Sequence, residues 1–176
     1  FRTRNRQLGH RGMPISGDVY RQMGRAAAGA VSVVAVQDED RSAIIALTVS
    51  TFATLSFDPP LVMFAIQHDT AAYAAIVTSK VFGVSLLSAD QVDVARLFAS
   101  RARERARTIA FATGPWLQVP LVPGSLAQVE CRTSEILMGG DHAIVVGLVE
   151  GANTRDGEPL LYFARQYGAF TPLAGA

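Results

Sequence analysis

The segment ALTVSTFATLSFDPP at residues 46–60 combines hydroxyl side chains with apolar residues and ends at two prolines. Its hydroxyl-bearing residues are Thr48, Ser50, Thr51, Thr54 and Ser56. Small hydroxyl groups both donate and accept hydrogen bonds, so such a cluster beside apolar side chains can bind a ligand that is partly polar and partly apolar. The alternative is a β-strand whose Ser and Thr side chains only face solvent. Because proline cannot donate to a sheet, we expect Pro59 and Pro60 to end one strand and set the turn into the next.

Few other residues could carry chemistry. The chain has one cysteine, Cys131, and three histidines, His10, His68 and His142, so neither an internal disulfide nor a metal site is expected. Cys131 lies in a predicted strand, where we expect a buried, unreactive thiol, and we place His68 in a surface loop. The motifs GxGxxG after a strand, GxxxxGKS/T, HExxH and GxSxG are missing, which argues against Rossmann, P-loop, zincin and α/β-hydrolase sites.

Length and composition favour one compact domain. With 176 residues, 49% of them hydrophobic and 18% charged, the chain can bury a single core. Its longest apolar run is about as long as LVMFAI at 61–66, far short of the roughly 18 residues that a membrane span requires. The single cysteine and the lack of a secretory hydrophobic region are typical of a cytoplasmic protein, and we predict a single domain over residues 17–176.

Basic residues gather in two stretches. Four arginines lie within residues 1–11 and four within residues 101–107, and outside these stretches acidic residues outnumber basic ones. A nucleic-acid surface needs a broad basic footprint, so we expect no nucleic-acid partner. The N-terminal stretch has no periodicity, and we predict a flexible tail over residues 1–16. The stretch RARERAR at 101–107 is typical of a solvated helix face on which Glu104 pairs with its neighbours.

Short apolar runs separated by turns predict mostly strands. Their ranges are 31–36, 44–49, 61–66, 81–87, 127–137 and 142–151. Helical spacing marks three further segments, which are 18–28, 70–79 and 89–107. Ser16 or Asp18 could cap the first of these helices. The fold class is therefore β-rich α+β, with an antiparallel barrel or sandwich and a few flanking helices.

Five segments occur in an order that matches a known family. They are ALTVSTFATLSFDPPLVMFAI, QHDTAAYAAI, SKVFGVSLLSADQVDVARLFA, GGDHAIVVGLVEG and DGEPLLYFARQYG. The most specific parts are a T-x-S-S/T-F block followed by S-x-x-P-P, and a G-D-H-x-I-x-x-G block. From about residue 18 to residue 170, the chain resembles the flavin reductase-like, FMN-binding split-barrel family. The resemblance implies an antiparallel split β-barrel that forms a homodimer with flavin near the interface.

The resemblance also implies a set of cofactor-binding residues. They are Thr48, Val49, Ser50, Thr51, Ser56, Gln67, Thr70, Ser85 and Arg107. FMN has a flat, mostly apolar ring with a polar edge, a hydroxylated chain and a phosphate, which suits small donors and acceptors beside an apolar wall.

The start of the helix at 70–79 is the expected phosphate site. Asp69 or Thr70 can cap this helix, and a helix N-terminus offers free N–H groups to an anion. Family members commonly carry Ser, Arg and Thr here, whereas this chain keeps Thr70 and has alanine at residues 71 and 72. Arg107 lies where the family often has a basic residue and could compensate.

The G-D-H block supplies the candidate catalytic residue. In the family this histidine lies near the flavin on the nicotinamide side, and His142 occupies that position. The alternative is a histidine at the start of a strand that only bonds nearby backbone. Arg165 and Tyr167 resemble C-terminal basic and aromatic positions on the nicotinamide side.

The function implied by the resemblance is that of an NAD(P)H:flavin oxidoreductase. Such an enzyme reduces FMN or FAD with NADH or NADPH, by hydride transfer from nicotinamide C4 to flavin N5, and supplies reduced flavin to a partner monooxygenase. One alternative is a split-barrel protein that holds FMN as a fixed prosthetic group and uses a different electron donor. Another is a non-enzymatic binding module.

Overall fold

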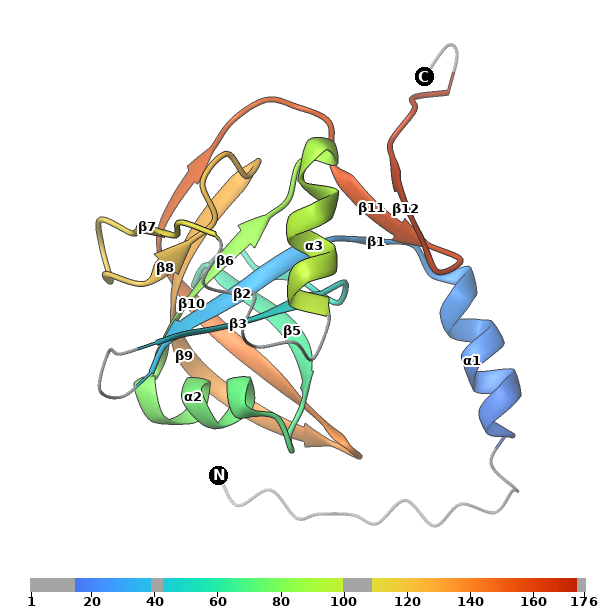
Figure 1. The fold of residues 1–176 in the computed structure, drawn as a ribbon. Coiled ribbons are helices and arrows are strands. Elements are labelled where there is room, and N and C mark those ends of the chain that lie inside the picture. Colours follow the sequence, from blue (N-terminus) through green and yellow to red (C-terminus); the bar gives the residue numbers. More distant parts are fainter. Residues whose placement is uncertain (1–14, 39–42, 100–108, 174–176) are drawn as a thin grey trace.

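An antiparallel sheet that rolls up on itself forms the body of the computed structural model, which describes residues 15–38, 43–99 and 109–173 (Figure 1). Within these ranges the sheet has seven strands in the order β3-β2-β6-β9-β10-β5-β4. The strands are β2 (Ser32–Gln37), β3 (Ile44–Val49), β4 (Ala53–Ser56), β5 (Leu61–Gln67), β6 (Val81–Leu86), β9 (Ala127–Gly139) and β10 (His142–Thr154). Every neighbouring pair is antiparallel.

The two edges of this sheet are consecutive in the chain. Strand β3 ends at Val49 and β4 begins at Ala53, so only residues 50–52 connect one edge of the sheet to the other. A connection of this length forces the two edges together, because three residues span about 10 Å at most. The sheet therefore closes into an incomplete barrel, with a seam between β3 and β5.

Strand β2 is buried on both faces. Val34 and Val36 face the interior of the barrel, where they pack in one cluster with Phe64 and Phe82. Val33 belongs to a second cluster, on the outer face of the sheet. This explains why the run VSVVAV has no polar alternation, since a strand between two apolar layers reads as continuously hydrophobic.

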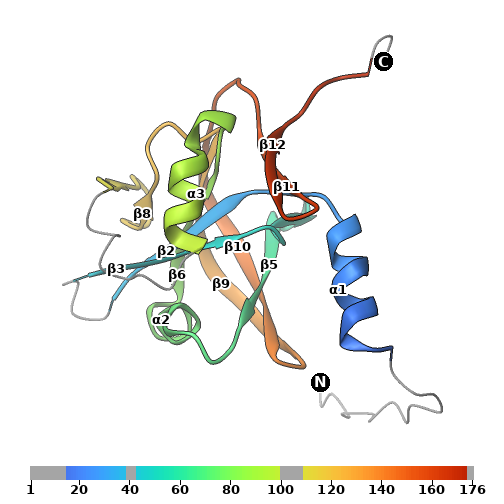
Figure 2. The ribbon, with the colours of Figure 1, turned by 45° about the vertical axis from the view of Figure 1, so that its right-hand side comes forward.

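Three α-helices accompany the sheet in the described ranges. Helix α2 (Ala71–Ser79) packs against β2 and β3, and α3 (Val92–Ala99) follows the short 3₁₀ turn η1 (Ala89–Gln91) and covers the second cluster. Helix α1 (Gly17–Ala26) begins at Ser16, whose hydroxyl accepts a hydrogen bond from the Val19 amide. Figures 1 and 2 show α1 standing apart from the barrel, and none of its residues is buried.

Two small sheets complete the fold. One contains β1 (Gly29–Ala30), β11 (Leu160–Phe163) and β12 (Gln166–Ala169), and the other contains β7 (Ala112–Thr113) and β8 (Pro120–Leu121). Pro59 and Pro60 lie in the turn between β4 and β5, as expected. No helix in the described part of the chain is both long and apolar enough to cross a membrane.

The predicted elements are confirmed in type, with differences at their ends. All six predicted strands and the helices at α1 and α2 are present. The helix predicted over 89–107 begins as a 3₁₀ turn, and its part from residue 100 onward lies outside the described residues. Of the tail predicted over residues 1–16, residues 1–14 also lie outside the described residues, and Ser16 is the cap of α1. Sequence reasoning missed the short strands β1, β4, β7, β8, β11 and β12. These have two to four residues each, too few for a periodic signal.

Strand β9 carries two neighbouring buried residues with opposite orientations. Cys131 packs in the barrel interior, where burial raises the pKa of its thiol to about 12, with a further contribution from the charge of Glu130. The thiol is therefore protonated and inert at neutral pH, as expected. Glu130 is fully buried, and its two carboxylate oxygens accept hydrogen bonds from the amides of Trp116 (3.2 Å) and Leu117 (2.5 Å).

The carboxylate of Glu130 therefore holds the loop after β7 against the sheet, and its loss has a measurable cost. We expect Glu130→Gln to lower the free energy of unfolding by roughly 1–3 kcal/mol, because one of the two amides would face a donor in place of an acceptor. Trp116 is the single tryptophan, so its fluorescence reports the position of the loop during chemical denaturation. The matched control is Glu135→Gln, an exposed position on the same strand, which should leave stability unchanged. Equal stabilities for the two variants would contradict this role of Glu130.

Candidate functional site

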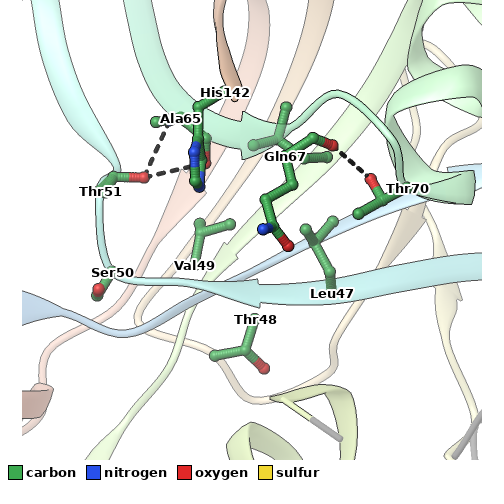
Figure 3. Close-up of a pocket in the computed structure, with 10 residues that line it drawn as sticks. Leu47, Thr48, Val49, Ser50, Thr51, Ala65, Gln67, Thr70 and His142 are labelled. Atoms are coloured by element: carbon green, nitrogen blue, oxygen red, sulfur yellow. Dashed lines mark hydrogen bonds between the residues drawn. The ribbon is translucent and has the colours of Figure 1, made fainter. Parts of the chain in front are cut away.

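A pocket lies at the seam of the barrel, between the end of β3 and the end of β5. It has a volume of about 210 Å³ and opens to solvent. Its lining residues are Leu47, Thr48, Val49, Ser50, Thr51, Ala65, Ile66, Gln67, Thr70 and His142. Figure 3 shows side chains from β3, β5 and β10 converging on this space. Seven of the residues predicted from the sequence are thus brought together, and their role as cofactor or substrate contacts stays a proposal.

The alternation of β3 decides which of its groups face the pocket. Leu47 and Val49 point into it, while Thr48 points to the opposite side of the strand (Figure 3). The Thr48 hydroxyl donates a hydrogen bond of 2.8 Å to the carbonyl of Ala95 in α3. The side chain of Thr48 therefore ties β3 to α3, and this residue meets the pocket through its backbone.

Thr51 closes the seam. Its hydroxyl accepts a hydrogen bond from the Ala65 amide (2.9 Å) and lies 3.3 Å from the Ala65 carbonyl, to which it donates. The pairing of β5 with β4 ends at Met63, so Ala65 has no partner strand on this side. The Thr51 hydroxyl supplies the hydrogen bonds that such a strand would make with the Ala65 backbone. The Thr51 side chain thus holds the two walls of the pocket at a fixed separation.

Ser50 and Gly29 shape the loop next to Thr51. Ser50 is exposed, and its hydroxyl has no hydrogen bond within the part of the chain that the structure describes. Gly29 in β1 lies directly against the Ser50 backbone, and a side chain at residue 29 would collide with the Ser50 carbonyl. This close approach requires glycine and sets the position of the loop from the side of β1.

The N-terminus of α2 meets the pocket at Thr70. The Thr70 hydroxyl accepts a hydrogen bond from the Tyr73 amide (3.2 Å) and donates one to the Gln67 carbonyl (2.8 Å), which identifies Thr70 as the cap of α2. The amides of residues 71 and 72 precede the first intrahelical bond, so they are available to an anion at this end of the helix. The side chain of Gln67 extends over β3 between Leu47 and Val49 in Figure 3.

His142 is the first residue of β10 and lies opposite Gln67 of β5. Its imidazole is 44% exposed and hangs into the pocket, and its Nδ1 atom lies 2.7 Å from a carboxylate oxygen of Asp141. The hydrogen bond from His142, followed by the charge of the same ring, lowers the pKa of Asp141. Asp141 is therefore ionised at neutral pH. His68, on the neighbouring turn, is exposed as expected.

Four predicted site residues in the described ranges lie outside the pocket. Ser56 ends β4, and Ser85 is buried in β6, where its hydroxyl accepts a hydrogen bond from the Val122 amide. Arg165 occupies the turn between β11 and β12. Tyr167 packs on Tyr162, with Arg96 above its ring, and burial is the main cause that raises its pKa. Arg107 lies outside the described residues.

Sequence reasoning missed four residues of this region. Leu47, Ala65 and Ile66 belong to the apolar part of the lining together with the predicted Val49, and Asp141 contacts His142. The apolar residues gave no signal because they are also ordinary strand residues. Asp141 stood beside His142 in the quoted G-D-H block, so adjacency was the signal that could have found it.

Comparisons with known proteins give this fold and pocket a family. The chain matches the family model described as flavin reductase like domain over residues 23–171, and therefore belongs to that family. It is 36% identical over 131 residues to the protein named FMN reductase (NADH) SmoA of Agrobacterium fabrum, and the match covers 72% of each chain. It is 37% identical over 143 residues to the reductase component of 4-hydroxyphenylacetate 3-monooxygenase of Thermus thermophilus, covering 80% of this chain and 87% of that one.

A solved structure extends the similarity to the whole fold. It is that of the Streptomyces globisporus NADH:FAD oxidoreductase SgcE6 in complex with NAD and FAD fragments. The two chains superimpose with a TM-score of 0.82 at 28% sequence identity, and the match covers 93% of this chain and 99% of that one. The predicted split-barrel fold and family are therefore confirmed.

The Thr51 bridge can be tested in the protein alone. We expect Thr51→Val to raise the amide hydrogen-exchange rate of Ala65 roughly five- to tenfold, because the loss of one hydrogen bond of about 1 kcal/mol frees this part of β5. Thr51→Ser keeps the hydroxyl and serves as the control. If Ala65 stays as protected in the valine variant as in the serine variant, Thr51 does not hold the seam.

Proposed function

We propose that this protein is an NAD(P)H:flavin oxidoreductase that reduces FMN or FAD with NADH or NADPH and supplies reduced flavin to a partner oxygenase. The observation that carries the proposal is the pocket at the seam in a chain of the flavin reductase family. The named relatives support it, because one is an NADH-dependent FMN reductase and another is the reductase component of a monooxygenase.

The groups that line the pocket fit a flavin. An isoalloxazine ring needs an apolar wall, which Leu47, Val49 and Ile66 supply, and hydrogen-bonding groups along its polar edge. The backbone of residues 48–51 and the side chains of Ser50 and Gln67 would supply those groups. The amides at the start of α2 would bind the phosphate. When bound, flavin supplies an acceptor at N5 for the hydride that leaves nicotinamide C4.

The protein's own contribution is alignment. Hydride transfer depends on the distance and angle between two rings more than on acid or base groups, so a rigid pocket is the main catalytic requirement. Thr51 holds the two walls together, and Gly29 positions the loop that carries Ser50. His142 would orient the nicotinamide from the β10 side. No side chain needs to act as a nucleophile.

Residues 71 and 72 bear on how the flavin is held. Both are alanine, so backbone amides alone would bind the phosphate at this end of α2. The described residues that line the pocket include no lysine or arginine, which favours a flavin that exchanges with solvent and passes to an oxygenase. A fixed FMN with a different electron donor is the second candidate function.

Assembly and location complete the proposal. The apolar side chains of Val19, Tyr20 and Met23 on α1 are about half exposed, and an apolar helix face of this kind suits a contact with a second copy. We propose that the protein forms a homodimer with two copies of the pocket. We also propose that it acts in a reducing cytoplasm.

Steady-state kinetics test the activity and the role of His142 together. The purified protein should oxidise NADH or NADPH when FMN or FAD is supplied. His142→Ala should lower kcat/KM for the nucleotide about tenfold, equivalent to about 1.4 kcal/mol of lost alignment, and leave flavin affinity nearly unchanged. A melting curve serves as the control for folding. Normal nucleotide kinetics in a folded variant would remove His142 from the catalytic assignment, and no nucleotide oxidation by the unaltered protein would refute the reductase function.

Light scattering tests the dimer. The protein should have the mass of two chains, and Val19→Asp combined with Met23→Asp should shift it toward one chain, because two charges would be buried in the contact. Arg21→Asp places the same residue on the other side of α1 and should leave the dimer intact. A fully active monomer at working concentration would disprove the homodimer.

A further inference from the structure

The turn between β9 and β10 fixes Asp141 beside the pocket. It contains two residues, Gly140 and Asp141, and Gly140 has a φ of +71° in the left-handed region that favours glycine. The pairing of Gly139 with His142 holds the turn from one side. The His68 amide donates a hydrogen bond of 3.3 Å to the Asp141 carbonyl from the other side. The backbone of Asp141 is thus held by two separate elements.

This placement controls the hydrogen positions of His142. An ionised carboxylate only accepts hydrogen bonds, so the Nδ1 atom that lies 2.7 Å from Asp141 must carry the proton. A neutral imidazole has one N–H group, which leaves Nε2 unprotonated. In its neutral form the ring therefore presents a hydrogen-bond acceptor to the pocket, whereas the protonated ring would present a donor.

An acceptor at this position selects a donor on the ligand. In the reaction proposed above, the nicotinamide ring carries a carboxamide with an NH₂ group, which is a donor of the required kind. Gln67, opposite His142, has both a donor and an acceptor and imposes no such choice. Whether this side of the pocket offers the ligand a hydrogen-bond acceptor or a donor therefore depends on the Asp141–His142 pair.

We propose that Asp141 is a positioning residue that locks His142 in the Nδ1–H tautomer, so that Nε2 accepts a hydrogen bond from the nicotinamide carboxamide NH₂. Asp141 itself does not touch the nucleotide. The tautomer part of this inference concerns the free protein, and the carboxamide part rests on the proposed reductase function.

Nuclear magnetic resonance tests the tautomer without any ligand. Long-range proton–nitrogen correlations of the His142 ring, identified by their loss in His142→Ala, should show the Nδ1–H form at a pH where the ring is neutral. Asp141→Ala should shift the ring to the Nε2–H form, which an unconstrained imidazole favours. The control is Asp69→Ala, which removes a carboxylate from the neighbouring turn and should leave the tautomer unchanged. An Nε2–H ring in the unaltered protein, or an unchanged ring in Asp141→Ala, would overturn the role of Asp141.

A nucleotide analogue tests the acceptor. The 3-acetylpyridine analogue of the reduced nucleotide has an acetyl group in place of the carboxamide, so it keeps the carbonyl next to the ring but lacks the NH₂ donor. The preference for the natural nucleotide over this analogue, measured as the ratio of kcat/KM values, should fall about tenfold in both Asp141→Ala and His142→Ala. It should stay unchanged in Asp69→Ala. Because each ratio is compared within one enzyme, the different hydride-donating strength of the analogue cancels between variants.

The two measurements separate this inference from the proposed function. Unchanged discrimination in Asp141→Ala, with the tautomer shifted as expected, would show that His142 does not bind the carboxamide and would overturn that part of the inference. Absence of nucleotide oxidation in every protein would refute the reductase function, and the resonance measurement would then decide the role of Asp141 alone.

Discussion

The hydrogen bonds between Thr51 and Ala65 are the constraint on which the candidate site depends. A rolled sheet leaves two edges, and backbone groups at an edge need partners. Here a side chain supplies the partner where the neighbouring strand has ended, so the sheet closes without a continuous ladder. Because the bridge is local, the space beside it stays open, and that space is the pocket. The barrel is thus closed at the seam, and the open pocket lies at the same place.

The polar groups of the pocket divide into those that build it and those that are available to a ligand. The hydroxyls of Thr48, Thr51 and Thr70 bond to Ala95, Ala65 and the backbone of α2 and Gln67, respectively, so they act as supports. The backbone of β3, the start of α2 and the side chains of Ser50, Gln67 and His142 remain available. The backbone groups of such a site depend on the path of the chain, which the three threonine hydroxyls hold in place.

The elements were predictable from sequence where a pattern extended over several residues. The apolar runs of β2, β5 and β10 followed from spacing and residue type alone, and the cap of α2 was narrowed to Asp69 or Thr70, of which the structure has Thr70. The barrel closure did not, because it depends on two edges that meet only in three dimensions. The periodicity of the strands did not distinguish a barrel from a sandwich. The resemblance to a known family predicted the split barrel.

The set of residues that line the pocket was predicted better than the direction of their side chains, and their role in binding stays a proposal. The block around residues 48–51, Gln67, Thr70 and His142 converges as the resemblance implied. The direction of each side chain was not predictable, because a shift of one residue along a strand reverses its face. Thr48 shows this most clearly, since its hydroxyl serves α3 while its backbone borders the pocket. Ser85 shows it too, because a hydroxyl in a strand can be a buried structural partner.

Strand β2 contributes to two separate hydrophobic clusters, and this sharing has a consequence for cooperativity. Val34 and Val36 belong to the barrel interior and Val33 to the layer beneath α3. Neither cluster can come apart without exposing a strand that the other also buries, so the two layers should unfold as one unit. Slow fluctuations that open the layer under α3 should then be rare. Strand β3, which pairs with β2 and lines the pocket, should be held equally firmly.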